Sequence, residues 1–139
     1  MPDGLKELLK DAIEEKEVTA DDIAREVKRI ASEDEEIKKE ISLMEEMIFN
    51  VKIGDTIEIG VKINGDELSV DGISDEPDFF IDIPLKILSE MLLGDRDVTS
   101  SLMGGDIVTW REGEVYDASK LNLLVPLIMS FARELKLKI

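Results

Sequence analysis

The stretch "MIFNVKIGDTIEIGVKINGDELSVDGI", residues 47–73, decides the fold because apolar and polar side chains alternate along it. In "TIEIGVKI", residues 56–63, every second residue is Ile or Val. This period of two is typical of a strand with one buried and one solvated face. Asn64 and Gly65 form the dipeptide favoured in tight hairpin turns. The stretch therefore predicts short antiparallel strands that are neighbours in sequence and in space.

Two later segments extend this sheet. "DFFIDI", residues 78–83, predicts a fourth strand that continues the meander of sequential neighbours. "GGDIVTWREGE", residues 104–114, predicts a fifth strand, and Gly104 and Gly105 allow close approach of the backbone at its start. We therefore expect a five-stranded, mostly antiparallel sheet.

The residues before the sheet have helical spacing. "GLKELLKDAIEE", residues 4–15, places its apolar residues at intervals of three and four, as on one face of a helix. Thr19 with Asp22 three residues later is an Asp variant of the capping box, which marks the start of a second helix. Ser32 with Glu35 repeats this start signal for a third helix.

The helical period returns after the fourth strand. Pro84 suits a first helical position, and Gly94 suits the end of that helix. Thr99–Met103 predicts a short helix, and the chain from Asp117 onward predicts a last helix that runs to the end. Pro126 removes one helical hydrogen bond, so a kink or break is expected there. The class is α+β, with helices covering one face of the sheet.

Charge excludes several partners. Lys and Arg total 17 against 33 Asp and Glu, which gives a formal net charge of -16. Such a surface repels phosphate backbones and anionic headgroups, so nucleic acid is not expected as a partner and a membrane is expected only through transient apolar contact. No signal peptide is evident at the start, and no apolar run is long enough to span a bilayer. We expect a cytoplasmic protein.

The composition also argues against catalysis. The chain has no Cys and no His, which removes thiolate chemistry and the commonest general base and metal ligand. "GDRD" and "SDEPD" resemble fragments of calcium loops, but neither has the full ligand spacing. We therefore expect no enzyme activity, no metal and no cofactor.

Two segments carry more apolar residues than a surface helix needs: "PLKILSEMLLGDRDVTSSLMGG", residues 84–105, and "LNLLVPLIMSFA", residues 121–132. In the last helix, one face can cover the sheet while other apolar residues point elsewhere; the first group is Leu121, Leu124, Val125 and Ile128, and the second is Leu123, Leu127 and Phe131. The excess fits burial between two layers, a homodimer interface or the wall of an internal cavity. Trp110, the only tryptophan, shares a strand face with Val108 and can wall such a cavity or anchor the sheet.

The order of these parts resembles the sterol carrier protein-2 family of lipid-binding domains. "PDFFIDI", "LSEMLLG", "SSLMGGDIVTWREGE" and "DASKLNLL" follow one another in the family's order and at compatible spacing. The resemblance covers roughly residues 19–132. It implies a lipid-binding domain over residues 19–139, preceded by an N-terminal helical extension over residues 1–18.

The resemblance implies an apolar tunnel between the sheet and the helices, and a fatty acyl, isoprenoid or sterol-like ligand, with no cofactor or catalytic residue. The residues expected to line it are Ile87, Leu88, Met91, Leu92, Leu102, Met103, Val108, Trp110, Leu121, Leu124, Ile128 and Met129. Arg96 and Arg111 are candidates to meet an acidic headgroup, although Arg96 lies between Asp95 and Asp97, where a local ion pair also fits. The alternative is a non-catalytic interaction module that uses the same apolar helices as a homodimer or as an accessory subunit of a lipid-metabolising enzyme.

Overall fold

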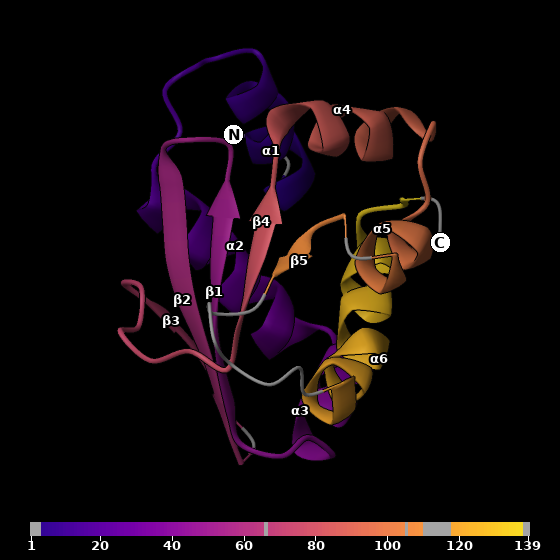
Figure 1. The fold of residues 1–139 in the computed structure, drawn as a ribbon. Helices are drawn as coiled ribbons and strands as arrows, with labels where there is room; N and C mark the ends of the chain where they lie inside the picture. Colours follow the sequence, from indigo (N-terminus) through magenta and orange to yellow (C-terminus); the bar gives the residue numbers. More distant parts are fainter. Residues whose placement is uncertain (1–3, 66, 105, 110–117, 138–139) are drawn as a thin grey trace.

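The computed structural model describes residues 4–65, 67–104, 106–109 and 118–137, which form an α+β fold (Figure 1). The elements, in chain order, are α1 (Leu5–Ile13), α2 (Ala20–Glu33), α3 (Glu35–Ser42), β1 (Met47–Ile53), β2 (Ile57–Asn64), β3 (Glu67–Asp71), β4 (Phe79–Ile83), α4 (Leu85–Leu93), α5 (Val98–Met103), β5 (Val108–Thr109) and α6 (Ala118–Glu134). The helices cover the apolar face of the sheet, which is called the inner face below.

The sheet has the strand order β3-β2-β1-β4-β5. The hairpins predicted between β1, β2 and β3 are confirmed, because β2 pairs antiparallel with both neighbours and Asn64 lies opposite Glu67. The meander is wrong at its last strand, since β4 pairs parallel with β1, with Phe49 opposite Phe79. The sheet is therefore mixed, and β1 rather than β3 is the partner of β4.

The connection from β3 to β4 explains this pairing, because residues 72–78 cross the outer face of the sheet. The side chain of Asn50 on β1 donates a hydrogen bond to the Ser74 carbonyl oxygen at 2.9 Å and accepts one from the Ser74 backbone N–H at 2.8 Å. Farther along, the backbone N–H of Asp78 donates to the carbonyl of Ile48 at 2.7 Å. The crossing chain thus satisfies polar groups that would otherwise be buried without partners.

The structure describes part of the predicted fifth strand. Among the described residues, β5 comprises Val108 and Thr109, which pair antiparallel with β4. Residues 110–114 of the predicted strand lie outside the described residues. The length expected for this strand is therefore not confirmed.

The helix starts follow local capping chemistry. The capping box predicted at Thr19 is confirmed, because the Thr19 side chain accepts from the Asp22 N–H and the Asp22 carboxylate accepts from the Thr19 N–H. The start signal at Ser32 is wrong. Ser32 lies inside α2, and Asp34 caps α3 by accepting from the Ile37 N–H at 3.1 Å.

α4 and α6 each end close to a residue with a positive φ angle. Gly94 ends α4 in the left-handed conformation with φ 81°, as predicted for a glycine at this position. α6 runs through Pro126 without a break and ends at Glu134, before the end of the chain. There, Lys136 takes φ 58° and turns the backbone, so that the Leu137 N–H donates to the Ala132 carbonyl at 2.9 Å.

The first helix shares the core of the rest of the chain. Leu5, Leu8, Leu9 and Ala12 of α1 are buried, and α1 contacts both α2 and α4. Figure 1 shows α1 and α4 near the same end of the sheet. The boundary between residues 18 and 19 stays a prediction, but α1 packs as part of one hydrophobic core.

Candidate functional site

A cavity of about 220 Å³ lies between the inner face of the sheet and the helices that cover it. Every described residue that lines it is apolar. The strands and the segment before β5 contribute Phe49, Val51, Ile53, Ile59, Val61, Leu68, Ile81, Ile83 and Ile107. The helices and the turn after α6 contribute Leu5, Leu9, Ile23, Val27, Leu88, Met91, Val98, Leu124, Leu127, Ile128, Phe131, Ala132, Leu135 and Leu137.

Strand alternation explains the sheet side of the cavity. Phe49, Val51 and Ile53 are alternate residues of β1 and therefore point to the same face. Phe49 stacks on Phe79 of β4, with ring centroids 5.2 Å apart and ring planes 3° from parallel. The two rings give this part of the inner face a rigid apolar surface.

A continuous stripe of α6 forms much of the helix side. Leu124, Leu127, Ile128 and Phe131 follow one another at helical intervals of three and four, and all line the cavity. The expectation that Leu127 and Phe131 point away from the layer that covers the sheet is therefore wrong. Val125, expected in that layer, does not line the cavity. The stripe follows the 3.6-residue period through Pro126, because the helix is not interrupted there.

Of the residues expected to line the site, Leu88, Met91, Leu124 and Ile128 lie on the cavity wall. Ile87 and Leu92 are half-buried on α4 and pack against the core, outside the cavity. Leu102 is fully buried in α5 but is not part of the wall. These positions show which face of each helix meets the cavity.

Met129 lies on another side of α6. It contacts α5, where the Thr99 hydroxyl is 3.4 Å from its sulfur atom. The side chains of Met103, Val108 and Leu121 lie outside the description, and Trp110 lies outside the described residues altogether. Their part in the site stays a prediction.

The first helix supplies residues that the sequence reasoning missed. Leu5 and Leu9 of α1 line the cavity, although the resemblance implies that α1 is an extension. The helical spacing of these leucines shows that one face of α1 is buried. Spacing alone does not show whether a buried face meets packed side chains or a hollow. The leucine pattern therefore predicts that this face of α1 is buried, but not that it lines a cavity.

Neither candidate arginine is placed at the cavity. Arg96 binds Glu90 and Asp106, with its Nε 3.0 Å from Glu90 Oε2 and its Nη1 2.8 Å from Asp106 Oδ2. These ion pairs replace the one expected with Asp95 or Asp97. The hydrogen bond to Glu90 is the main cause that raises the pKa of the Arg96 guanidinium above its ordinary value. Arg111 lies outside the described residues.

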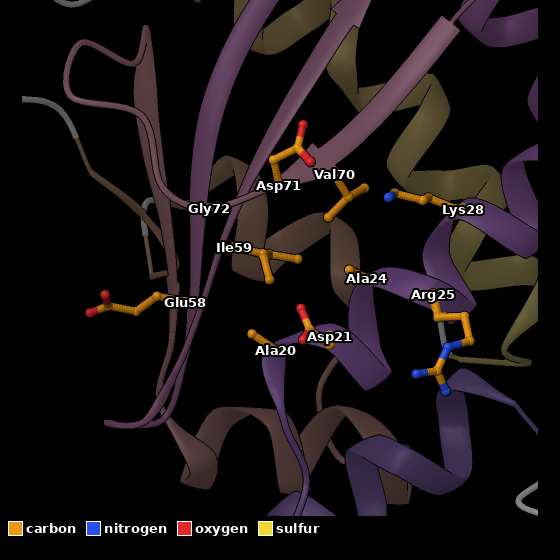
Figure 2. Close-up of a pocket in the computed structure, with 10 residues that line it drawn as sticks. All are labelled: Ala20, Asp21, Ala24, Arg25, Lys28, Glu58, Ile59, Val70, Asp71 and Gly72. Carbon is orange, nitrogen blue, oxygen red and sulfur yellow. The ribbon is translucent and has the colours of Figure 1, made fainter.

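A second hollow, of about 540 Å³, lies between α2 and the β2–β3 side of the sheet (Figure 2). It is called the polar groove below, and it is lined by Ala20, Asp21, Ala24, Arg25, Lys28, Glu58, Ile59, Val70, Asp71 and Gly72. Figure 2 shows Lys28 extending toward Val70, while the Glu58 carboxylate points away from the other side chains. Charges of both signs thus surround a small apolar floor.

Ile59 lines both hollows and is only 4% exposed. It therefore forms part of the wall between the polar groove and the apolar cavity. The residues of α2 divide in the same way: Ile23 and Val27 line the cavity, whereas Ala24 and Lys28 line the groove. The charged groups of the groove are thus separated from the cavity by a buried aliphatic side chain.

Within the described part of the chain, no group of three or more acidic side chains is arranged to hold a metal ion. None of the helices over these residues is long and apolar enough to cross a membrane.

Known proteins resemble this chain in structure. No family model and no curated protein matches the sequence. The crystal structure of sterol carrier protein 2 is similar over 81% of this chain and 90% of that chain, with 19% identity and a TM-score of 0.52. The chain therefore has a sterol carrier protein 2-like fold, and the fold implied by the sequence resemblance is confirmed.

Two solution structures show weaker similarity. One is a conserved hypothetical protein of Thermus thermophilus, whose description suggests a sterol carrier protein; it has 20% identity and a TM-score of 0.45, over 78% of this chain and 82% of that one. The other is the sterol carrier protein domain 2 of Helicoverpa armigera, with 14% identity and a TM-score of 0.42, over 78% of this chain and 80% of that one.

Proposed function

We propose that this chain is a lipid-binding or lipid-carrier protein that holds an aliphatic guest between the sheet and its helices. The single observation that carries the proposal is the cavity itself, since every described residue on its wall is apolar. The sterol carrier protein 2-like fold supports the same function. The guest classes are fatty acyl, isoprenoid and sterol-like chains, and the protein binds and releases them without a chemical step.

The energetics suit a carrier. Burial of one methylene group contributes about 0.8 kcal/mol, so a sixteen-carbon chain gains on the order of 12 kcal/mol when it leaves water. A bilayer offers the same chain nearly the same gain. A carrier therefore needs only to match the membrane, and a loosely fitting apolar cavity is enough for exchange between the two.

We propose that the cavity enlarges around a long guest. At about 220 Å³ it is smaller than the roughly 300–1,000 Å³ typical of sites for drug-sized ligands. Met91, with its flexible thioether side chain, is suited to move. We propose that such movement extends the cavity into a tunnel, with α6 as its lid.

Native mass spectrometry of the protein purified from its own host tests the proposal. We expect co-purified lipid at about one molecule per chain. Delipidated protein should take up a long-chain alcohol at the same stoichiometry. Empty protein that forms dimers and refuses added lipid would contradict the proposal and favour the interaction module.

A further inference from the structure

We infer that the part of the guest that enters the cavity is uncharged, so that the protein accepts alcohols, esters and hydrocarbon chains and rejects ionised fatty acids. This inference rests on the proposed function and narrows its ligand class. It comes from what the cavity wall, the buried polar groups and the surrounding charges offer to a carboxylate.

The cavity wall offers no hydrogen bond from its described side chains, all of which are apolar. The described polar residues that are buried, Asn50, Ser101 and Ser130, do not line it. Each of them also has a partner: Asn50 pairs with Ser74, the Ser101 hydroxyl donates to the Asp97 carbonyl, and the Ser130 hydroxyl accepts from Arg133. Against the described part of the wall, an ionised carboxylate would therefore lose its hydration without a replacement.

The arginines described near the cavity are bound to carboxylates. Arg96, beyond the end of α4, binds Glu90 and Asp106. Arg133 on α6 binds Glu36 of α3. Recruiting either guanidinium to a guest would break an ion pair that already exists, so neither offers a ready headgroup site.

The negative charge of the whole chain also disfavours an anionic guest. The chain carries a formal net charge of -16, so the field of the whole protein disfavours the approach of an anion. Lys28 and Arg25 lie in the polar groove, on the far side of the Ile59 wall. A neutral alcohol of the same length keeps the gain from apolar burial and avoids both costs.

The volume sets the length of the probe. About 220 Å³ equals roughly seven groups with the ~30 Å³ that a water molecule occupies in the liquid. Methylene groups are of similar size, so the eight-carbon chain of octan-1-ol is about as large as the cavity. Methyl octanoate is the matched neutral ester, and octanoate is the matched anion.

The three probes should be titrated into the full delipidated chain at neutral pH, with the methyl resonances of Leu88 and Leu124 followed by NMR. We expect the alcohol and the ester to shift these resonances, and octanoate to bind about tenfold more weakly or worse, a difference of about 1.4 kcal/mol or more. Equal affinity for octanoate would overturn the inference and leave the proposed function standing. Absence of binding by all three probes would instead contradict the proposed function.

Two variants sharpen the result. If octanoate binds well and Arg111→Gln abolishes its binding, the anion is held by Arg111 and the inference is overturned. Ile128→Lys places a cation at a half-buried position on the cavity wall. In a folded Ile128→Lys protein we expect the preference to shift toward octanoate, and an unchanged preference would count against the inference.

Discussion

A Cβ atom on Gly60 would collide with the carbonyl oxygen of Gly72. Gly60 is on the outer face of β2, where the chain that leaves β3 crosses the sheet toward β4. The backbone oxygen cannot move aside as the end of a flexible side chain could, so β2 needs a residue without a side chain at this position. The contact allows the crossing that places β4 beside β1.

Gly60→Ala should therefore destabilise the fold by about 1–3 kcal/mol, the usual cost of overpacking a filled space. Urea denaturation followed by far-UV circular dichroism measures the change. Gly72→Ala is the matched control, since a Cβ there meets nothing within 4 Å. Equal losses in the two variants would show that the close approach is not the cause.

Ala132→Leu should reduce lipid uptake by filling the cavity. Ala132 lies on the cavity wall and is 3% exposed, so a larger aliphatic side chain takes space that a guest would use. We expect affinity for a bound alcohol to fall about tenfold, or about 1.4 kcal/mol, as measured by titration calorimetry.

Ala24→Leu is the control for that experiment, because Ala24 lines the polar groove and not the cavity. It makes the same chemical change on another helix and should leave uptake unchanged. Loss of uptake in Ala24→Leu alone would place the guest in the groove instead.

Pro126→Ala should slow the exchange of lipid. Proline inside a helix removes one hydrogen bond and costs about 3 kcal/mol, so α6 is weakened near its centre. Alanine restores an N–H that donates to the Asn122 carbonyl and stiffens the proposed lid. Stopped-flow transfer of a fluorescent long-chain alcohol to vesicles gives the rate, and unchanged kinetics would discard the role of Pro126 as the point of bending.

Acid should weaken the start of α2. The backbone hydrogen bond from Thr19 is the main cause that holds the pKa of Asp22 below its ordinary value of 3.8. Because the folded state binds this proton more weakly than the unfolded state, the stabilisation is present above pH 3.8 and is lost as the pH falls through the lower pKa of the folded state.

The capping box can be tested at both partners. Thr19→Ala should cost about 0.5–2 kcal/mol at neutral pH through loss of the N-cap. Asp22→Asn should flatten the acid-dependent part of the unfolding curve, measured by urea denaturation at several pH values. An Asp22→Asn protein with the wild-type pH profile would rule out this carboxylate as the titrating group.

Local signals in the sequence predicted local structure well. Alternation identified β1 and β2, and Thr19, Gly94 and the hairpin at Asn64 marked element ends correctly. The partner of β4 was missed because it depends on contacts distant in sequence, such as the one between Asn50 and Ser74. Nothing in the period of "DFFIDI" distinguishes a strand beside β3 from one beside β1.

The candidate site was predictable only in part for a related reason. An apolar excess on α4 and α6 pointed to Leu88 and Leu124, which do line the cavity. It did not show that Leu5 of α1 completes the wall, because an amphipathic helix has the same spacing whether it meets side chains or empty space. Which helix face meets the hollow depends on how the helices are set against the sheet.

Ile59 lines both the cavity and the polar groove, so a single substitution at this position can change which guests the fold binds. Ile59→Ala would join an oily compartment to one that carries lysine and arginine, at a cost in stability of about 2–5 kcal/mol. A variant that tolerates this loss of stability would gain, by one mutation, a site for an amphiphile. The apolar tail would lie in the cavity and the charged head in the polar groove. Natural selection can thus widen the range of ligands that bind here while the fold stays the same.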